Sequence, residues 1–88
     1  MKTSPAQQIF AREFDSDYFL LSKNLQELIQ RKIDQMGAHL ATFPHTRLQG
    51  AAGNYRLRVG DYRVIYAFDL ARNVVFLKLV GHRREVCR

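Results

Sequence analysis

The sequence has little cysteine and no long apolar run, and each shortage excludes a class of protein. One cysteine, Cys87, cannot form a disulfide within the chain and offers no cluster of metal ligands. No apolar run approaches the roughly 20 residues that a membrane-spanning helix needs. The opening residues, MKTSPAQQIF, lack the apolar segment of about 7–15 residues that marks a secretory signal. We therefore expect a cytoplasmic protein with no metal, no cofactor and no membrane partner.

The length and the apolar content bound the architecture. A chain of 88 residues, 47% of them apolar, is expected to fold as a single domain over residues 1–88 with one compact core. The sequence contains no internal repeat, no low-complexity segment and no stretch typical of a linker.

The two halves of the chain differ in charge. Residues 1–44 carry five basic and five acidic side chains, whereas residues 45–88 carry nine basic and three acidic ones. The whole excess of +6 therefore lies in the second half. Such asymmetry favours a polyanionic partner, either a nucleic acid or a strongly acidic protein segment. The alternative is a basic surface that is merely solvated.

The first half is typical of a short strand followed by two helices. Residues 7–14 are expected to form the strand, and Asp15 can cap a short helix that ends near Leu21. Asn24, with Glu27 three residues later, predicts the N-cap of a longer helix. Apolar residues at helical spacing indicate one core-facing stripe along it: Leu25, Leu28, Ile29, Ile33, Met36 and Leu40.

The second half predicts a loop over residues 44–53 and then three strands, over residues 54–59, 62–68 and 74–81. Gly60 and Asp61 are typical of a two-residue hairpin turn, of type II′ because glycine comes first. The last strand, VVFLKLV, is almost continuously apolar and is expected to be either central in the sheet or well covered. The predicted fold class is thus α+β, with an N-terminal helix pair packed on a small antiparallel sheet.

The two-residue turn fixes how the first two of these strands pair, and the pairing decides which side chains share a face. Val59 is expected to pair with Tyr62, and Arg58 with Arg63. Arg56, Arg58 and Arg63 then share the face turned away from the helices. Like charges directly opposite destabilise a sheet by roughly 0.2–1 kcal/mol. A phosphate bound between them would replace this repulsion with charge-assisted bonds, for which the guanidinium fork is well shaped. The alternative is two splayed, solvated arginines.

The third strand is expected to extend the arginine face. If Phe68 pairs with Val74, the odd-numbered residues of that strand lie on the arginine face, with Arg83 near the hairpin turn. His82 and Arg84 would then point to the opposite side. The same face would also carry apolar residues, namely Ile65, Ala67, Val75, Leu77 and Leu79. An uncovered apolar patch on a small protein marks a partner surface.

Three stretches, RLQG (47–50), NYRLRVGDYRVIYAFD (54–69) and VGHRREV (80–86), resemble the RelE/ParE superfamily of toxin–antitoxin toxins, and its RelE branch in particular. FAREFDSDYFLL (10–21) stands in the place of the family's opening strand and first helix, so the resemblance covers nearly the whole chain. It implies the RelE-like fold of the microbial-RNase type. It also implies a toxin that cleaves messenger RNA in the ribosomal A site and inhibits translation. A RelB-like antitoxin would neutralise it in a hetero-oligomer.

The resemblance also implies roles for single residues. Arg56 and Arg58 match a basic pair that contacts backbone phosphate and assists the 2′-hydroxyl, and Arg63 matches the arginine that stabilises the scissile phosphate. Arg83 matches the arginine that helps the leaving oxygen. Cys87 stands where RelE nucleases usually have a tyrosine that stacks on a base, and such stacking contributes about 1–3 kcal/mol. The wider set expected to contact RNA is Arg47, Lys78, His82, Arg84, Cys87 and Arg88.

The chemistry of these residues leaves several readings open. Arginines stabilise a pentacoordinate phosphate but essentially do not deprotonate. Histidine is the residue type best suited to exchange a proton at neutral pH, and His82 is the one near these arginines in the sequence. His82 is expected to point away from the arginines, however, and it can equally be a structural histidine. We therefore expect an endoribonuclease that works by positioning and electrostatics, with the ribosome ordering the RNA. The alternatives are a ParE-type, non-enzymatic inhibitor of DNA gyrase and a decayed toxin that only binds its antitoxin.

Overall fold

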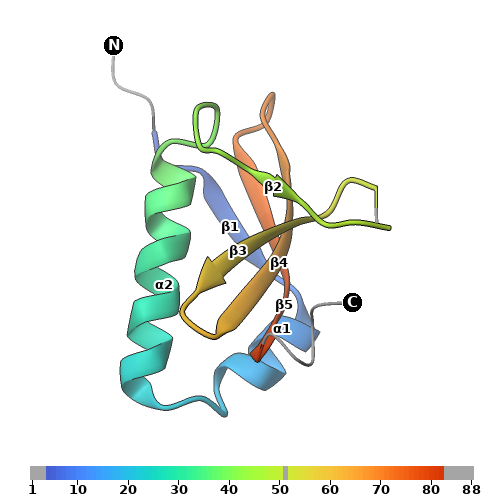
Figure 1. Cartoon of the computed structure of the whole chain (residues 1–88). Helices are drawn as coiled ribbons and strands as arrows, with labels where there is room; N and C mark the ends of the chain where they lie inside the picture. Colours follow the sequence, from blue (N-terminus) through green and yellow to red (C-terminus); the bar gives the residue numbers. More distant parts are fainter. Residues whose placement is uncertain (1–3, 51, 83–88) are drawn as a thin grey trace.

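The structure is a computed structural model of the chain, and it describes residues 4–50 and 52–82 (Figure 1). Four of the predicted site residues, Arg83, Arg84, Cys87 and Arg88, lie outside the described residues. The elements in chain order are β1 (Gln7–Phe10), α1 (Arg12–Tyr18), α2 (Lys23–Ala38), β2 (Thr46–Arg47), β3 (Tyr55–Val59), β4 (Tyr62–Asp69) and β5 (Val74–His82).

The strands form one five-stranded sheet in the order β1-β5-β4-β3-β2. β1 pairs with β5 in parallel, and the other neighbours pair antiparallel. The predicted α+β fold class is confirmed, and β5 is an internal strand, paired with β1 on one side and with β4 on the other. The two-residue strand β2 was not predicted, because its residues lie in what the sequence presents as a loop.

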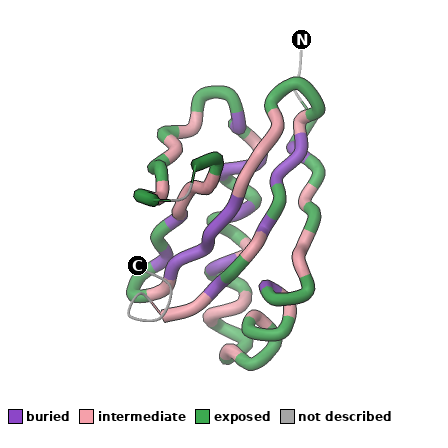
Figure 2. The backbone as a smooth tube through the Cα atoms, turned by 90° about the vertical axis from the view of Figure 1, so that its right-hand side faces the viewer, coloured by how far each residue is buried: buried purple, intermediate pink, exposed green. Residues whose placement is uncertain are grey.

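Both helices pack on the same face of the sheet. Their buried side chains join those of the strands in one core, which contains Phe14, Ile29, Ile33, Met36, Leu57, Val59, Val64, Tyr66, Val75, Leu77 and Val80. Figure 2 shows the buried residues along the middle of the long strands. The other side of the sheet, which we call the open face, carries no helix from the described part of the chain. Neither helix has the length and apolar character that a membrane crossing requires.

The helix starts differ from the sequence prediction. Phe14 is not at the end of the strand but inside α1, where it is fully buried, and Asp15 lies in the first turn rather than at the cap. The N-cap of α2 is Ser22 and not Asn24, because the Ser22 Oγ accepts a hydrogen bond from the Leu25 backbone N–H at 3.2 Å. Cap preference alone cannot separate two good capping residues two positions apart.

The β3–β4 hairpin confirms the predicted register. Val59 pairs with Tyr62, and Arg58 with Arg63, across a two-residue turn. Gly60 has a φ of +61°, a left-handed conformation that glycine adopts without strain. Among the described residues, Asp61 is not one of those with positive φ, which agrees with the predicted type II′ turn.

The register of β5 was predicted wrongly over its first half. Asp69, not Phe68, pairs with Val74, so Phe76 lies on the open face. Val75 and Leu77, which were expected there, are fully buried in the core. A β-bulge then restores the expected alternation: Tyr66 pairs with Leu77 and Ile65 with Leu79, which leaves Lys78 as the extra residue. The open face therefore carries Ile9, Arg56, Arg58, Arg63, Ile65, Ala67, Phe76, Lys78 and Leu79.

Candidate nucleic-acid interface

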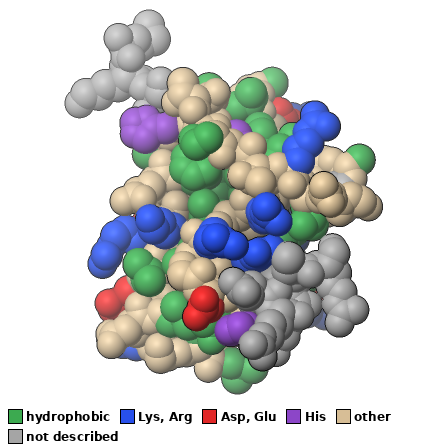
Figure 3. Space-filling model, in the orientation of Figure 1, with side chains coloured by type: hydrophobic (Ala, Val, Ile, Leu, Met, Phe, Trp, Pro, Cys, Tyr) green, Lys and Arg blue, Asp and Glu red, His purple; other side chains and the backbone are tan. Residues whose placement is uncertain are grey.

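Three arginines lie together on the open face because of the hairpin register. Arg58 and Arg63 are direct cross-strand neighbours, and Arg56 lies two residues along β3 on the same face. Arg58 is exposed and Arg56 is half-buried, whereas the Arg63 side chain keeps 7% of its exposure. Figure 3 shows Lys and Arg side chains gathered over β3. The structure thus brings the three predicted residues to one surface.

Two of these arginines have no carboxylate partner in the described part of the chain. Neither Arg56 nor Arg58 makes an ion pair with any residue between 4 and 82 that the structure describes. Asp69, which ends β4 at the other end from Arg63, pairs with Arg72 at 3.8 Å between Oδ2 and Nε. The exposed guanidinium of Arg58 is therefore available to an anion from outside the molecule.

Lys78 adds a fourth cation to the open face. Its Nζ donates a hydrogen bond of 2.6 Å to the Oδ1 of Asn54, the residue directly before β3. Since β4 lies between β5 and β3, the lysine side chain crosses β4 on the open side of the sheet. The amide carries no charge, so it orients the ammonium group without neutralising it.

Two other predicted residues lie away from this surface. Arg47 pairs with Tyr55, whose side chain packs against the core, so the structure does not bring Arg47 to the open face. His82 pairs with Tyr62, and their rings meet edge to face at 5.5 Å between centroids. His82 is thus on the side of Tyr62, as the register predicted, and not among the arginines.

His45 was not predicted from the sequence to have a role, and it has a structural one. Its Nε2 lies 2.8 Å from the Leu40 carbonyl oxygen, which can only accept, so Nε2 carries a proton. In the neutral ring Nδ1 then accepts a hydrogen bond from the Tyr66 hydroxyl at 2.6 Å. The ring also stacks on Phe68 at 4.1 Å. A hint existed in the sequence, since a tyrosine at a core position needs a partner for its hydroxyl.

The buried tyrosine of this pair is held in its protonated form. Burial raises the pKa of the Tyr66 hydroxyl well above its ordinary value, and the neighbouring Tyr55 adds a smaller effect in the same direction. Tyr66 therefore stays neutral at physiological pH and remains a hydrogen-bond donor to His45. This pair supports the core behind β4 and takes no part in the open face.

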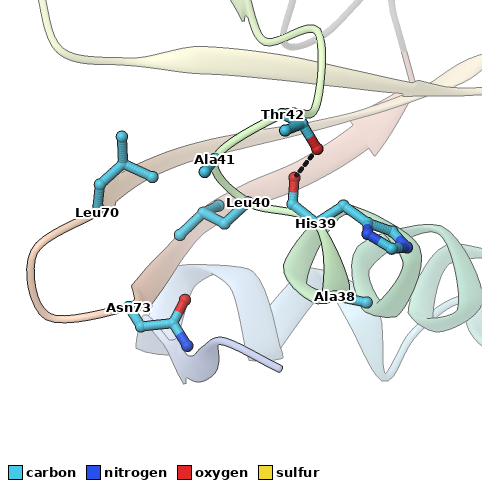
Figure 4. Close-up of a pocket in the computed structure, with 7 residues that line it drawn as sticks. All are labelled: Ala38, His39, Leu40, Ala41, Thr42, Leu70 and Asn73. Carbon is cyan, nitrogen blue, oxygen red and sulfur yellow. Dashed lines mark hydrogen bonds between the residues drawn. The ribbon is translucent and has the colours of Figure 1, made fainter. Parts of the chain in front are cut away.

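A separate cavity of about 560 Å³ lies between the end of α2 and the β4–β5 loop (Figure 4). Among the described residues, the lining is mostly apolar and carries no lysine or arginine: Ala38, His39, Leu40, Ala41, Thr42, Leu70 and Asn73. The Thr42 hydroxyl donates to the His39 carbonyl at 3.4 Å. Because Leu70 follows β4 and Arg63 is near its start, the cavity is at the other end of the strand from the arginines. It is not part of the basic surface.

Comparison of the fold with solved structures finds toxin–antitoxin complexes and an isolated toxin. The RelBE2 toxin–antitoxin complex from Mycobacterium tuberculosis contains a chain that superposes with a TM-score of 0.77 at 20% identity, covering 93% of this chain and 95% of that one. The isolated RelE toxin of E. coli gives 0.73 at 19% identity, covering 88% and 83%. The E. coli RelBE complex gives 0.73 at 22% identity, covering 88% and 95%. At such identities the likeness shows the fold.

Sequence comparison places the chain in a family. No curated protein sequence matches it significantly. The family model described as the ParE toxin of type II toxin–antitoxin system, parDE, matches residues 8–86, which is most of the chain. The chain therefore belongs to the ParE toxin family and is a type II toxin–antitoxin toxin of the RelE/ParE superfamily.

Proposed function

We propose that this toxin is an endoribonuclease of the RelE type, which cleaves messenger RNA in the ribosomal A site and so inhibits translation. One observation carries the proposal. Arg56, Arg58 and Arg63 share the open face on paired strands, and the first two have no carboxylate partner among the described residues. Two arginines directly opposite each other destabilise a sheet, whereas a phosphate bound between them would form charge-assisted hydrogen bonds with their guanidinium groups.

The burial of Arg63 supports a role for it at the scissile phosphate. A guanidinium group held at 7% exposure changes its position and hydration little when an anion arrives. Such preorganised charge stabilises a transition state more than a mobile surface charge does. Arg58, exposed beside it, can approach the same phosphate from β3. Arg83 remains a prediction, as the residue expected to help the leaving oxygen.

The reaction would depend mainly on positioning. Cleavage through the 2′-hydroxyl needs a proton acceptor, and arginine essentially does not serve as one. His82 lies on the side of Tyr62, away from the three arginines. Electrostatic stabilisation by the open face, with the RNA ordered by the ribosome, is therefore the mechanism that we propose.

The cognate partner would be a RelB-like antitoxin in a hetero-oligomer. Beside the arginines the open face exposes Ile9 at 41%, and Phe76 and Leu79 at 38% each. A segment with acidic and apolar residues would complement both halves of this face, given the net charge of +6. The proteins of similar fold from M. tuberculosis and E. coli crystallised as toxin–antitoxin complexes, which supports this assignment.

A second candidate is inhibition of DNA gyrase without enzymatic activity. The description of the matching family as ParE favours it, and so does Cys87 in the place of the stacking tyrosine. A third candidate, a decayed toxin, would be harmless when expressed without antitoxin.

Expression from a tightly controlled promoter separates these candidates. For an endoribonuclease we expect growth arrest with new 5′ ends in ribosome-bound transcripts, and loss of both in Arg58→Gln. Arg72→Gln is the matched control, because Arg72 pairs with Asp69 away from the site. DNA damage with stalled gyrase and intact transcripts would instead favour the ParE-type activity.

A further inference from the structure

A β-bulge in β5 changes the side of the sheet to which Lys78 and Leu79 point. Leu77 is fully buried and Leu79 is exposed on the open face, although a regular strand would put both on one side. The extra residue between them is Lys78, opposite the Ile65–Tyr66 step of β4. The bulge thus lets Lys78 and Leu79 both avoid the core, and a bulge commonly serves to re-aim a side chain.

Asn54 fixes where the lysine ammonium group lies. The 2.6 Å bond to its Oδ1 holds Nζ over the beginning of β3. Asn54 continues the extended course of that strand, because its carbonyl accepts from the Leu48 N–H at 2.9 Å. Residues two apart on a strand share a face at a spacing of about 6.6 Å. The Lys78 ammonium group thus lies at position 54, and Arg56 and Arg58 follow at regular backbone intervals on the same face; we call these three cations the cation row.

The hydrogen bond to Asn54 leaves N–H donors of the Lys78 ammonium group that can bind an anion. An ammonium group has three donors, and the amide takes one of them. Lys78 makes no ion pair with any residue in the described ranges 4–50 and 52–82. The described residues therefore leave the charge of Lys78 uncompensated, and two of its N–H donors can bind an anion.

We propose that the cation row contacts three successive phosphates of an extended single-stranded RNA, with Asn54 as the residue that positions Lys78. This inference rests on the proposed function, since it extends the phosphate contacts of Arg56 and Arg58 by one nucleotide. The spacing along the row is comparable to that of neighbouring phosphates in an extended strand. Contacts of this kind fix the register of the RNA and do not read its bases.

The number of these phosphate contacts can be measured from the salt dependence of RNA binding. The probe is a short, fluorescently labelled 2′-O-methyl oligouridine, which cannot be cleaved through its 2′ position, bound to the full-length toxin over a series of salt concentrations. Each phosphate contact contributes about 0.7 to the slope of log K against log salt for single strands. We expect Lys78→Gln to reduce the slope by about 0.7 and Lys78→Arg to restore it. Lys32→Gln, an exposed change on α2, is the matched control and should leave the slope unchanged.

The role of Asn54 is tested by a double-mutant cycle. We expect Asn54→Ala to weaken RNA binding in the wild type and to have no further effect once Lys78→Gln is present. If Lys78→Gln leaves the slope unchanged while Arg58→Gln lowers it, the row ends at Arg56 and the inference is wrong. If Arg58→Gln also leaves the slope unchanged, the proposed RNA-binding function itself fails. Thermal unfolding of each variant confirms that the fold is retained.

Discussion

Arg63 differs from the other cations of the open face in its burial, and this difference decides how it should be tested. Arg63 is only 7% exposed, so truncating its side chain would leave a cavity as well as remove a charge. We expect Arg63→Lys to keep the fold but to lower RNA cleavage by about 10²–10³-fold, the usual effect of losing one transition-state donor. A lysine keeps the charge but cannot donate through a planar fork.

The measurement for Arg63→Lys combines single-turnover cleavage with chemical denaturation. A fall in cleavage with an unfolding free energy within about 1 kcal/mol of wild type supports the role at the phosphate. Full cleavage by the lysine variant would show that Arg63 contributes no directional contact. Arg72→Lys serves as the control for a change of the same kind in an exposed arginine.

The hydrogen bond between Tyr66 and His45 leads to a prediction about stability. Tyr66→Phe removes the donor to His45 Nδ1 and leaves a half-buried ring nitrogen without its partner. Such a loss costs about 1–3 kcal/mol. The control is Tyr55→Phe, because the Tyr55 hydroxyl makes no hydrogen bond with the residues that the structure describes. Equal unfolding free energies for the two variants would contradict the role of the pair.

The raised pKa of Tyr66 adds a dependence on pH. The unfolded chain releases the tyrosine proton near pH 10, whereas burial keeps it bound in the folded protein at higher pH. The stability is therefore complete below about pH 10 and falls as the pH rises above it. In Tyr66→Phe the free energy of unfolding should fall less over this pH range. The pKa of Tyr18 is also raised, by burial and then by Asp34 and Glu27, so a smaller decline should remain.

The helices and strands show which elements a sequence determines and which need the folded chain. The β3–β4 hairpin was predictable residue by residue, because a two-residue turn leaves one register. The first half of β5 was not, because it depends on a loop whose length cannot be read to one residue. The loop is one residue shorter than expected: it ends at Asn73, which has a φ of +56°, and Asp69 instead of Phe68 pairs with Val74. The bulge at Lys78 is likewise invisible in an apolar run.

The start of α2 provides a prediction for one element. Ser22→Ala removes the side-chain acceptor for the Leu25 N–H and should lower the unfolding free energy by about 1 kcal/mol. Asn24→Ala should cost much less, since Asn24 is exposed inside the first turn and does not cap the helix. Urea denaturation of both variants compares the two positions. A larger loss for Asn24→Ala would place the cap where the sequence alone suggested it.

In the molecule as a whole, the two faces of the sheet differ in role. The helix side holds the core, including the His45–Tyr66 pair, while the open face carries the cations and the exposed apolar residues. The charge asymmetry and the strand alternation were enough to predict a basic, partly apolar surface. They could not show that Arg47 lies off that surface or that Asn54 holds Lys78, because both follow from contacts between distant segments.

The proposed role of the open face is to position the phosphates of a ribosome-bound message for cleavage. Its most direct test is the purified toxin added to a defined ribosome complex with an empty A site, with cleavage read by primer extension. We expect a cut within the A-site codon that Arg58→Gln and Arg63→Lys both reduce by two orders of magnitude or more, while the Arg72→Gln variant cuts as the wild type does. An uncut message with fully folded toxin would contradict it.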